Sequence, residues 1–230
     1  MKNAIEVEKL TKIYGSGNTE VIAMSNVSLS VKHGEIAALL GPSGSGKSTF
    51  LTSVGLINSL TSGTIKIGDN LICDGGKNFL NLRKFRQKHI GFIFQKSNLI
   101  PFLTAKENIE IAMEMAGIGK KESAQRAMNL LTELGLEARA KNYPSMLSGG
   151  QQQRVAICRA LANKPDVILA DEPTAALDSK LGRHVMELLK NVSHEYGTAV
   201  IVVTHDHRAL EVFDTLYEME DGQIKRSNED

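Results

Sequence analysis

The feature that most constrains this chain is a glycine-rich segment set between an apolar run and a stretch that can form a helix. The run Ile36–Leu40 is apolar throughout and predicts a buried strand, while residues 50–54 can continue as a helix. Strand, glycine-rich turn and helix N-terminus, in this order, are the context of a phosphate-binding loop. The predicted loop comprises Gly41, Pro42, Ser43, Gly44, Ser45, Gly46, Lys47, Ser48 and Thr49.

The residue types in this loop suit a nucleotide phosphate. Gly41, Gly44 and Gly46 permit backbone angles that let successive N–H groups point at one anion. The helix that follows adds the positive end of its dipole. Lys47 supplies a full charge for the outer phosphates, and Ser48 offers a hydroxyl to a magnesium ion. A tight turn that contains Gly-Lys-Ser by chance is the alternative, and the flanking strand and helix favour nucleotide binding.

The charge balance and the cysteine content limit the kinds of ligand that the chain is expected to bind. The chain has 230 residues, enough for one large domain or two tightly joined ones. Its 27 basic residues nearly balance 26 acidic ones, for a net charge of +1, so nothing calls for nucleic acid as a direct ligand. The basic residues within 81–88 are expected to form a solvated helix face rather than a nucleic-acid contact. Cys73 and Cys158 are expected to be isolated apolar residues.

The N-terminal segment and the absence of long apolar runs bear on location. Residues 1–8 are too polar for a signal peptide, and no run approaches the ~18–20 apolar residues of a membrane span. We therefore expect a cytoplasmic chain that reaches a membrane only through a partner.

Strand and helix patterns alternate along most of the chain. Runs that are apolar on both faces at 90–94, 167–171 and 198–203, with helices predicted at 180–196 and 208–212, indicate a largely parallel sheet covered on both sides. Alternating runs at 5–8, 27–31 and 64–67 predict a small antiparallel sheet, and 74–78 reads as an exposed loop. A final hairpin is expected at 215–224.

A block of helices interrupts this α/β pattern. Thr104 and Glu107 form a capping box that begins one helix, and residues 120–134 predict a second, which Gly135 ends. The expected organisation is a single domain over residues 1–230. Its α/β core would comprise residues 1–95 and 161–230, and an inserted helical subdomain would comprise about 96–160.

Two acids follow a buried strand, where ligands gather in open α/β sheets. Asp171 is expected to hold magnesium, directly or through water. Glu172 is expected to accept a proton from an attacking water. Both could instead cap the turn that Pro173 and Thr174 begin, but the phosphate loop in the same chain favours chemistry.

A second candidate phosphate site lies far along the sequence. Ser148 and Gln151 form a capping box at the start of a helix, which is a sound structural role by itself. Gly149 and Gly150 leave the helix N-terminus bare, so its N–H groups could also bind a phosphate.

The order of these motifs resembles the ATP-binding cassette (ABC) ATPases, from Tyr14 to the turn at Asp221 and Gly222. The resemblance rests on the phosphate loop, Gln95, Leu147-Ser148-Gly149-Gly150-Gln151, the run 167–172 and His205. It implies a phosphate-loop, RecA-like α/β core with a small antiparallel β subdomain and an inserted α-helical subdomain. It also implies ATP and Mg²⁺ as ligands and hydrolysis of ATP to ADP and phosphate.

The family's arrangement explains why one chain has two phosphate sites. Two such domains pair head-to-tail in the ATP state, and the signature of one closes over the nucleotide on the loop of the other. By this resemblance the residues that contact nucleotide in trans are Ser148, Gly149, Gly150, Gln151 and Asp178. Asp178 could equally cap the following helix.

The remaining roles also follow from the resemblance. Tyr14 matches the aromatic residue that stacks on adenine, although strand packing would explain a lone tyrosine. Gln95 matches a glutamine that meets magnesium and the attacking water, and His205 matches a histidine that contacts the γ-phosphate. The resemblance therefore implies Lys47, Gln95, Glu172 and His205 as catalytic residues, and Ser48, Gln95 and Asp171 as the metal site.

Finer features resemble the macrolide-export, lipoprotein-release and glycolipid-exporter branch. They are the residues 90–95, 98–101, 103–108, 170–178 and 204–206. This branch implies a separate membrane permease that docks near Gln95 and residues 96–115, export or mechanical work across the envelope, and a periplasmic adaptor reached through the permease. The alternatives are a soluble ABC ATPase acting on DNA or ribosomes, a regulator that only signals through its membrane partner, and a small-molecule kinase.

Overall fold

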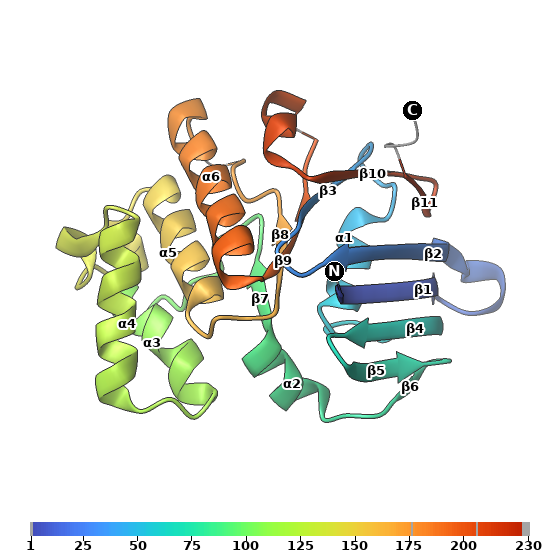
Figure 1. Ribbon diagram of the computed structural model, residues 1–230, viewed down its shortest axis with the longest axis horizontal. Helices are drawn as coiled ribbons and strands as arrows, with labels where there is room; N and C mark the ends of the chain where they lie inside the picture. The colour runs from blue at the N-terminus through green and yellow to red at the C-terminus, as the bar shows by residue number, and fades with distance from the viewer. Residues whose placement is uncertain (1, 176, 206, 227–230) are drawn as a thin grey trace.

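The computed structural model describes residues 2–175, 177–205 and 207–226. Ala176 and Asp206, which belong to two of the quoted motifs, lie outside the described residues, as do 227–230. The described chain forms two sheets and six α-helices, with short 3₁₀ turns between them (Figure 1).

The larger sheet has six strands in the order β11-β10-β3-β9-β8-β7. All neighbours in it are parallel except β10 and β11, which form the expected C-terminal hairpin. Its strands are β3 (Ile36–Leu40), β7 (Ile90–Ile93), β8 (Val167–Asp171), β9 (Ala199–Val203), β10 (Thr215–Glu220) and β11 (Gln223–Arg226). The α/β fold with a parallel core, predicted from the apolar runs, is confirmed.

The smaller sheet is antiparallel and has the order β2-β1-β4-β5-β6. Its strands are β1 (Asn3–Tyr14), β2 (Val21–Lys32), β4 (Ser62–Ile67), β5 (Asn70–Asp74) and β6 (Lys77–Asn78). The expectation of a loop at 74–78 is wrong, because Asp74 pairs with Lys77 across a tight hairpin. Gly75 and Gly76 form its turn with φ of 54° and 78°, angles that glycine adopts without strain.

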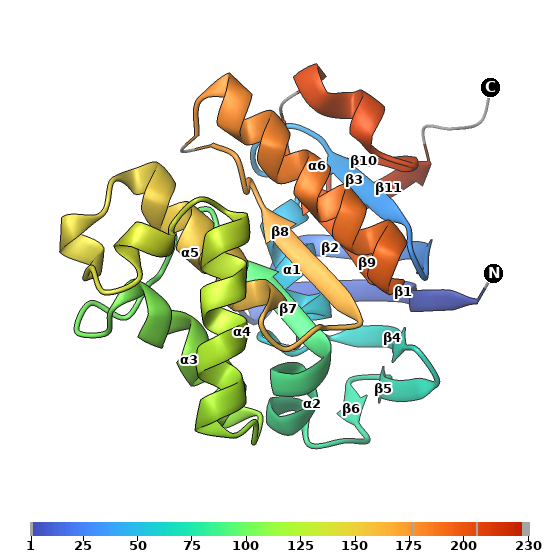
Figure 2. The same cartoon turned by 60° about the vertical axis from the view of Figure 1, so that its left-hand side comes forward.

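Helices cover the larger sheet and extend away from the smaller one. They are α1 (Lys47–Val54), α2 (Leu82–His89), α3 (Ala105–Met115), α4 (Lys120–Glu133), α5 (Gly149–Leu161) and α6 (Ser179–Tyr196). Figures 1 and 2 show α3, α4 and α5 grouped on the side of the molecule opposite the antiparallel sheet. The helix predicted at 208–212 is the 3₁₀ turn η4 (His207–Val212).

Local signals in the sequence explain several helix starts. The side chains of Thr104 and Glu107 form the predicted capping box at α3, and those of Ser148 and Gln151 form the one at α5. Asp178 accepts a hydrogen bond from the N–H of Leu181 and so caps α6.

The larger sheet is buried on both faces, as continuous apolar strands require. Alternate residues of β8 and β9 contribute to two hydrophobic clusters. Leu169 and Ile201 belong to the cluster shared with α1 and the antiparallel sheet. Ile168 and Val200 belong to the cluster shared with α3, α4, α5 and α6. The boundaries of the α/β core and the helical subdomain, at about residues 96 and 160, stay a prediction.

Candidate active site

A cavity of about 460 Å³ opens at the carboxyl ends of the parallel strands, where open α/β sheets bind ligands. Strand β3 leads into the phosphate loop, β7 into Gln95, β8 into the two acids and β9 into His205. The predicted site residues that line it are Ser43, Gly44, Gly46, Lys47, Ser48, Thr49, Gln95, Asp171, Glu172 and His205. Residues far apart in the sequence are thereby brought together at one site.

The phosphate loop is wedged between the two sheets. A Cβ atom on Gly41 would lie 2.1 Å from the carbonyl oxygen of Met219 in β10, and one on Gly46 would lie 2.5 Å from that of Ala23 in β2. With φ of 145° and 103° as well, both positions need glycine. The N–H of Gly222 also donates to the carbonyl of Ser45 at 3.1 Å, so the C-terminal hairpin braces the loop.

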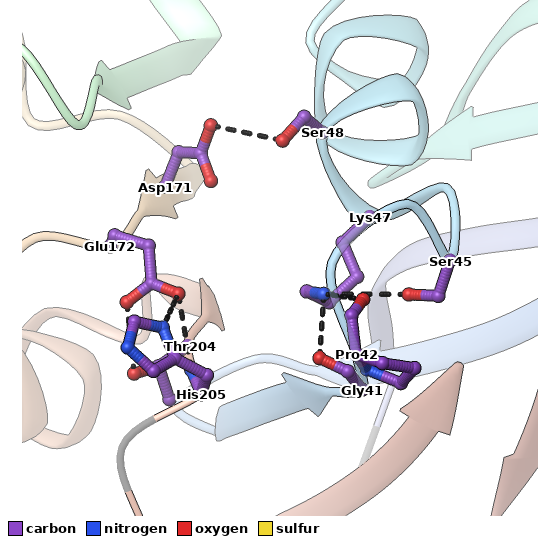
Figure 3. Close-up of polar contacts among 9 residues, drawn as sticks. All are labelled: Gly41, Pro42, Ser45, Lys47, Ser48, Asp171, Glu172, Thr204 and His205. Carbon is purple, nitrogen blue, oxygen red and sulfur yellow. Dashed lines mark hydrogen bonds and ion pairs between the residues drawn. The ribbon is translucent and has the colours of Figure 1, made fainter. Parts of the chain in front are cut away.

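Lys47 is held inside its own loop. Its side chain is only 9% exposed, and Nζ donates to the carbonyl oxygens of Gly41 and Pro42, both at 2.7 Å (Figure 3). Burial lowers the pKa of Lys47, while the nearby carboxylates of Glu172 and Asp171 act in the opposite direction. The positive charge of Lys47 therefore lies in a partly desolvated place, where its attraction for an anion is strongest.

Ser48 and Asp171 face each other across the cavity. Ser48 Oγ donates to Asp171 Oδ2 at 3.3 Å, and Gln95 lines the same cavity (Figure 3). Hydroxyl, carboxylate and amide oxygens are the hard donors that Mg²⁺ prefers, and phosphates complete its shell in nucleotide sites. The residues present therefore fit the magnesium that the sequence predicts.

Burial changes the ionisation of the Asp171 carboxyl group. Burial raises its pKa and Glu172 adds to the rise, while the hydrogen bond from Ser48 and the charge of Lys47 oppose it. The folded chain therefore holds a proton on Asp171 more tightly than the unfolded chain does. The resulting stabilisation is present below the usual carboxyl pKa and is lost as the pH rises through the raised pKa.

Asp171→Asn is therefore expected to stabilise the nucleotide-free protein. Asparagine cannot ionise but can still accept from Ser48, so we expect the melting temperature at neutral pH to rise by roughly 2 °C. The gain should shrink as the pH falls toward the usual carboxyl range. Thermal unfolding with EDTA at several pH values checks this, with Glu20→Gln, at an exposed position, as a control that should not respond. A gain that is independent of pH would contradict the assignment.

Glu172 is held by three groups at the end of β9. Its Oε1 lies 2.5 Å from His205 Nδ1 and accepts from the His205 N–H at 3.1 Å, while Oε2 accepts from Thr204 Oγ1 at 3.3 Å (Figure 3). The Glu172 side chain is 13% exposed and the His205 side chain 76% exposed, so Glu172 lies largely in the interior while His205 lies in the open cavity. The backbone of Glu172 has φ of 47°, a strained angle for a side chain of this kind.

Of the loop residues, Gly41 and Pro42 line a second pocket together with His205, and Ser45 is buried. Three other groups of predicted residues also lie outside the cavity. Tyr14 pairs with Val21 at the end of the β1–β2 hairpin, and its hydroxyl accepts from Asn58 at 3.4 Å. The capping box from Ser148 to Gln151 begins α5, with Ser148 and Gly149 exposed. Asp178 caps α6. The cavity is therefore lined by one set of predicted residues, while the set predicted to act on a partner's nucleotide faces elsewhere.

The sequence prediction missed the contact of Thr204 with Glu172 and that of Lys12 with the ring of Tyr14. Thr204 holds Glu172, and its position directly before His205 at a strand end was the available signal. Lys12 Nζ lies 4.8 Å from the centre of the Tyr14 ring, at the distance of a cation–π contact. Their alternation in β1 places both side chains on one face of the strand.

The family model and the relatives found by comparison with known proteins agree with one another. The family model described as ABC transporter matches residues 24–175. The uncharacterized ABC transporter ATP-binding protein MJ0796 of Methanocaldococcus jannaschii is 44% identical over 226 residues, covering 96% of this chain and 95% of that protein. The macrolide export ATP-binding/permease protein MacB of Mannheimia succiniciproducens is 42% identical, and the match covers 96% of this chain but only 34% of MacB.

Solved structures agree with these matches. The dimeric structure of a post-hydrolysis state of MJ0796 bound to ADP and Pi superposes with a TM-score of 0.89 at 42% identity, covering 96% of this chain and 97% of that one. The structure of cbiO1 from Clostridium perfringens, part of the ABC transporter complex cbiONQ, gives 0.83 at 28% identity, covering 98% and 88%. Within the described residues, no helix combines the length and the apolar character needed to cross a membrane.

Proposed function

Because this chain belongs to the ATP-binding cassette family of ABC transporters, and is thus an ATPase, we propose that its hydrolysis cycle drives a separate membrane permease. The observation that carries the proposal is the division of the phosphate-binding groups. Lys47, Ser48, Gly44 and Gly46 of the phosphate loop line one cavity, whereas the helix N-terminus at the Ser148 capping box lies outside it. A second copy of the chain would supply to each cavity what the first copy lacks.

We propose catalytic roles that are consistent with the contacts in the cavity. Lys47 and the loop N–H groups would bind the β- and γ-phosphates, which spreads negative charge over fixed donors. Glu172 would accept the proton of the attacking water, and His205, next to Glu172 Oε1, would contact the γ-phosphate. Ser48, Asp171 and Gln95 would hold magnesium, which when bound screens the phosphate charge.

Dimerisation would complete the site. In a head-to-tail pair, Ser148, Gly149, Gly150 and Gln151 would close over the γ-phosphate held by the partner's loop. Asp178 would cross the same interface while it still caps α6. Closure would require ATP, and hydrolysis would remove the γ-phosphate that links the two copies.

A groove beside Gln95 is the surface proposed for the permease. It encloses about 280 Å³ between α2, β7, α3 and α5, and its lining includes Ile57, Phe92, Phe94 and Met115. Phe92 and Phe94 stack with ring centres 4.2 Å apart, and Met115 is 53% exposed. An exposed apolar groove next to the catalytic glutamine suits an apolar segment of a membrane partner.

We further propose that the chain works at the cytoplasmic face of the membrane, within the export branch that MacB represents. A periplasmic adaptor would be reached only through the permease. Charge balance gives no reason to propose a nucleic-acid ligand.

Reconstitution with a membrane permease, sought first in the adjacent reading frames, tests this function. In vesicles, ATP turnover is expected to rise several-fold over that of the chain alone. Met115→Arg should bring the ratio of stimulated to basal turnover close to one, because a charge in the apolar groove opposes docking. Tyr196→Arg, a charge on an exposed residue of α6, is the matched control. Stimulation that survives Met115→Arg would contradict the docking surface, and no stimulation by any permease would favour a soluble or regulatory ATPase.

A further inference from the structure

The backbone just before Gln95 is held by helix α5. Gln153 is 2% exposed, and its Nε2 donates to the carbonyl oxygen of Phe94 at 3.0 Å. Phe94 directly precedes Gln95, and 59 residues separate it from Gln153 in the sequence. A buried amide that donates to one backbone carbonyl fixes where the chain leaves β7.

The backbone just after Gln95 is held by the same helix. The two terminal nitrogens of Arg159 donate to the carbonyl oxygens of Asn98 and Ser97, both at 2.8 Å. Ser97 Oγ donates to Gln152 Oε1 at 3.1 Å. Asn98 has a left-handed backbone with φ of 46°, a conformation that persists only where surrounding contacts impose it.

Arg159 is committed to these carbonyl groups. Burial lowers its pKa, and no carboxylate among the described residues forms an ion pair with it. A half-buried guanidinium whose fork binds two successive carbonyls gives a fixed geometry rather than a general attraction.

Only Gln95 and Lys96 therefore lie free between two fixed ends, and both are exposed. We propose that Gln152, Gln153 and Arg159 are positioning residues for Gln95, so that α5 determines how Gln95 reaches the metal side of the cavity. This inference rests on the proposed magnesium role of Gln95.

The N-terminus of α5 connects this arrangement to the proposed dimer interface. The helix begins at the Ser148 capping box, and Gln152 Nε2 also donates to the carbonyl oxygens of Pro144 and Leu147, in the segment that leads to Ser148. Gln152 thus joins the loop after Gln95 to the segment proposed to contact the partner's nucleotide. Closure over the partner's ATP would set Gln95 at the chain's own ATP, which couples the two sites of a dimer.

Gln153→Met tests the positioning role. Methionine keeps the length of the side chain but cannot donate to Phe94. Hydrogen exchange of the amides of residues 95–98 in the nucleotide-free chain is expected to speed up about tenfold. The gain in affinity for a fluorescent ATP analogue on adding Mg²⁺ should fall about tenfold, as for other residues that orient a metal ligand. Ser97→Ala removes one anchor with little risk to folding and should shift both readouts in the same direction.

The control and the double variant separate positioning from general stability. Gln125→Met on the exposed face of α4, where Gln125 donates to Asn129, should leave both readouts unchanged. In a Gln95→Ala background, Gln153→Met should cause no further loss of the magnesium effect, because both act through one residue. Additive losses would overturn the inference.

The remaining outcomes distinguish this inference from the function on which it rests. If Gln95→Ala leaves the magnesium effect unchanged, the metal role of Gln95 is wrong and the inference falls with it. If Gln95→Ala reduces the effect while Gln153→Met and Ser97→Ala match the wild type, only the positioning role is overturned. If Gln153→Met does not fold, Ser97→Ala decides between these outcomes.

Discussion

Replacing Glu172 by glutamine is expected to lower ATP turnover by about 10²–10⁴-fold, the usual contribution of a general base. Glutamine has the same shape: its single carbonyl oxygen can still accept from the His205 N–H, and its amide NH₂ can donate to Thr204 Oγ1 where the carboxylate accepted, so the site should keep its geometry. ATP binding should remain, because Glu172 is not among the groups proposed to bind the phosphates. The γ-phosphate then stays in place, and we expect an ATP-dependent dimer to accumulate.

Two measurements check this result. Phosphate release gives the turnover, and light scattering with and without ATP gives the mass of the particle. Glu137→Gln, an exposed glutamate in the 3₁₀ turn η2 (Glu137–Arg139), is the matched control and should behave as the wild type. Turnover at the wild-type rate in Glu172→Gln would show that another group accepts the proton.

Replacing Lys47 by alanine is expected to reduce both nucleotide affinity and turnover at least about a hundredfold. Among the described residues that line the cavity, the ammonium group is the only basic group apart from His205, and its partly buried place strengthens its attraction for phosphate. Isothermal titration with ATP and magnesium measures the affinity, and steady-state phosphate release measures the turnover.

Loss of folding must be separated from loss of the charge, because Lys47 also donates to Gly41 and Pro42. Lys47→Met keeps most of the side-chain volume and should lose nucleotide binding to the same extent as alanine, with an unchanged circular dichroism spectrum. Lys77→Ala, in the exposed β5–β6 hairpin, should leave affinity and rate as they are. Unchanged affinity and rate in Lys47→Ala would remove the phosphate loop as the nucleotide site.

Much of the fold was readable because local and global signals agree. The apolar run Val167–Asp171 is buried on both faces, as its composition predicts, and the capping boxes at Thr104 and Ser148 begin helices where expected. The gathering of the phosphate loop with Asp171 and Glu172 followed from one rule, that parallel strands present their carboxyl ends at one edge, whereas His205 was assigned from the resemblance to the ABC ATPases.

The failures have physical reasons. Residues 74–78 read as a loop because their polar side chains hide a two-residue hairpin, although two adjacent glycines are a hairpin signal. The anchors around Gln95 depend on contacts such as Gln153 with Phe94, 59 residues apart, and no sequence period reports them. The hydrogen bonds from Lys47 to its own loop likewise depend on where the side chain lies, which no sequence pattern reports. The roles assigned to the site residues stay predictions until the variants are measured.

The bracing of the phosphate loop has a consequence for how the protein is made. The loop belongs to the first fifth of the chain, but β3, which carries it, pairs with β9 and β10, and Gly222 closes on Ser45. During synthesis, domains fold from the N-terminus as the chain leaves the ribosome. Here the loop can take its final shape only after residue 222 has emerged. A nascent chain therefore gains its nucleotide site only once β10 and β11 have been made, so ATP stabilises chains that include this hairpin and not shorter ones.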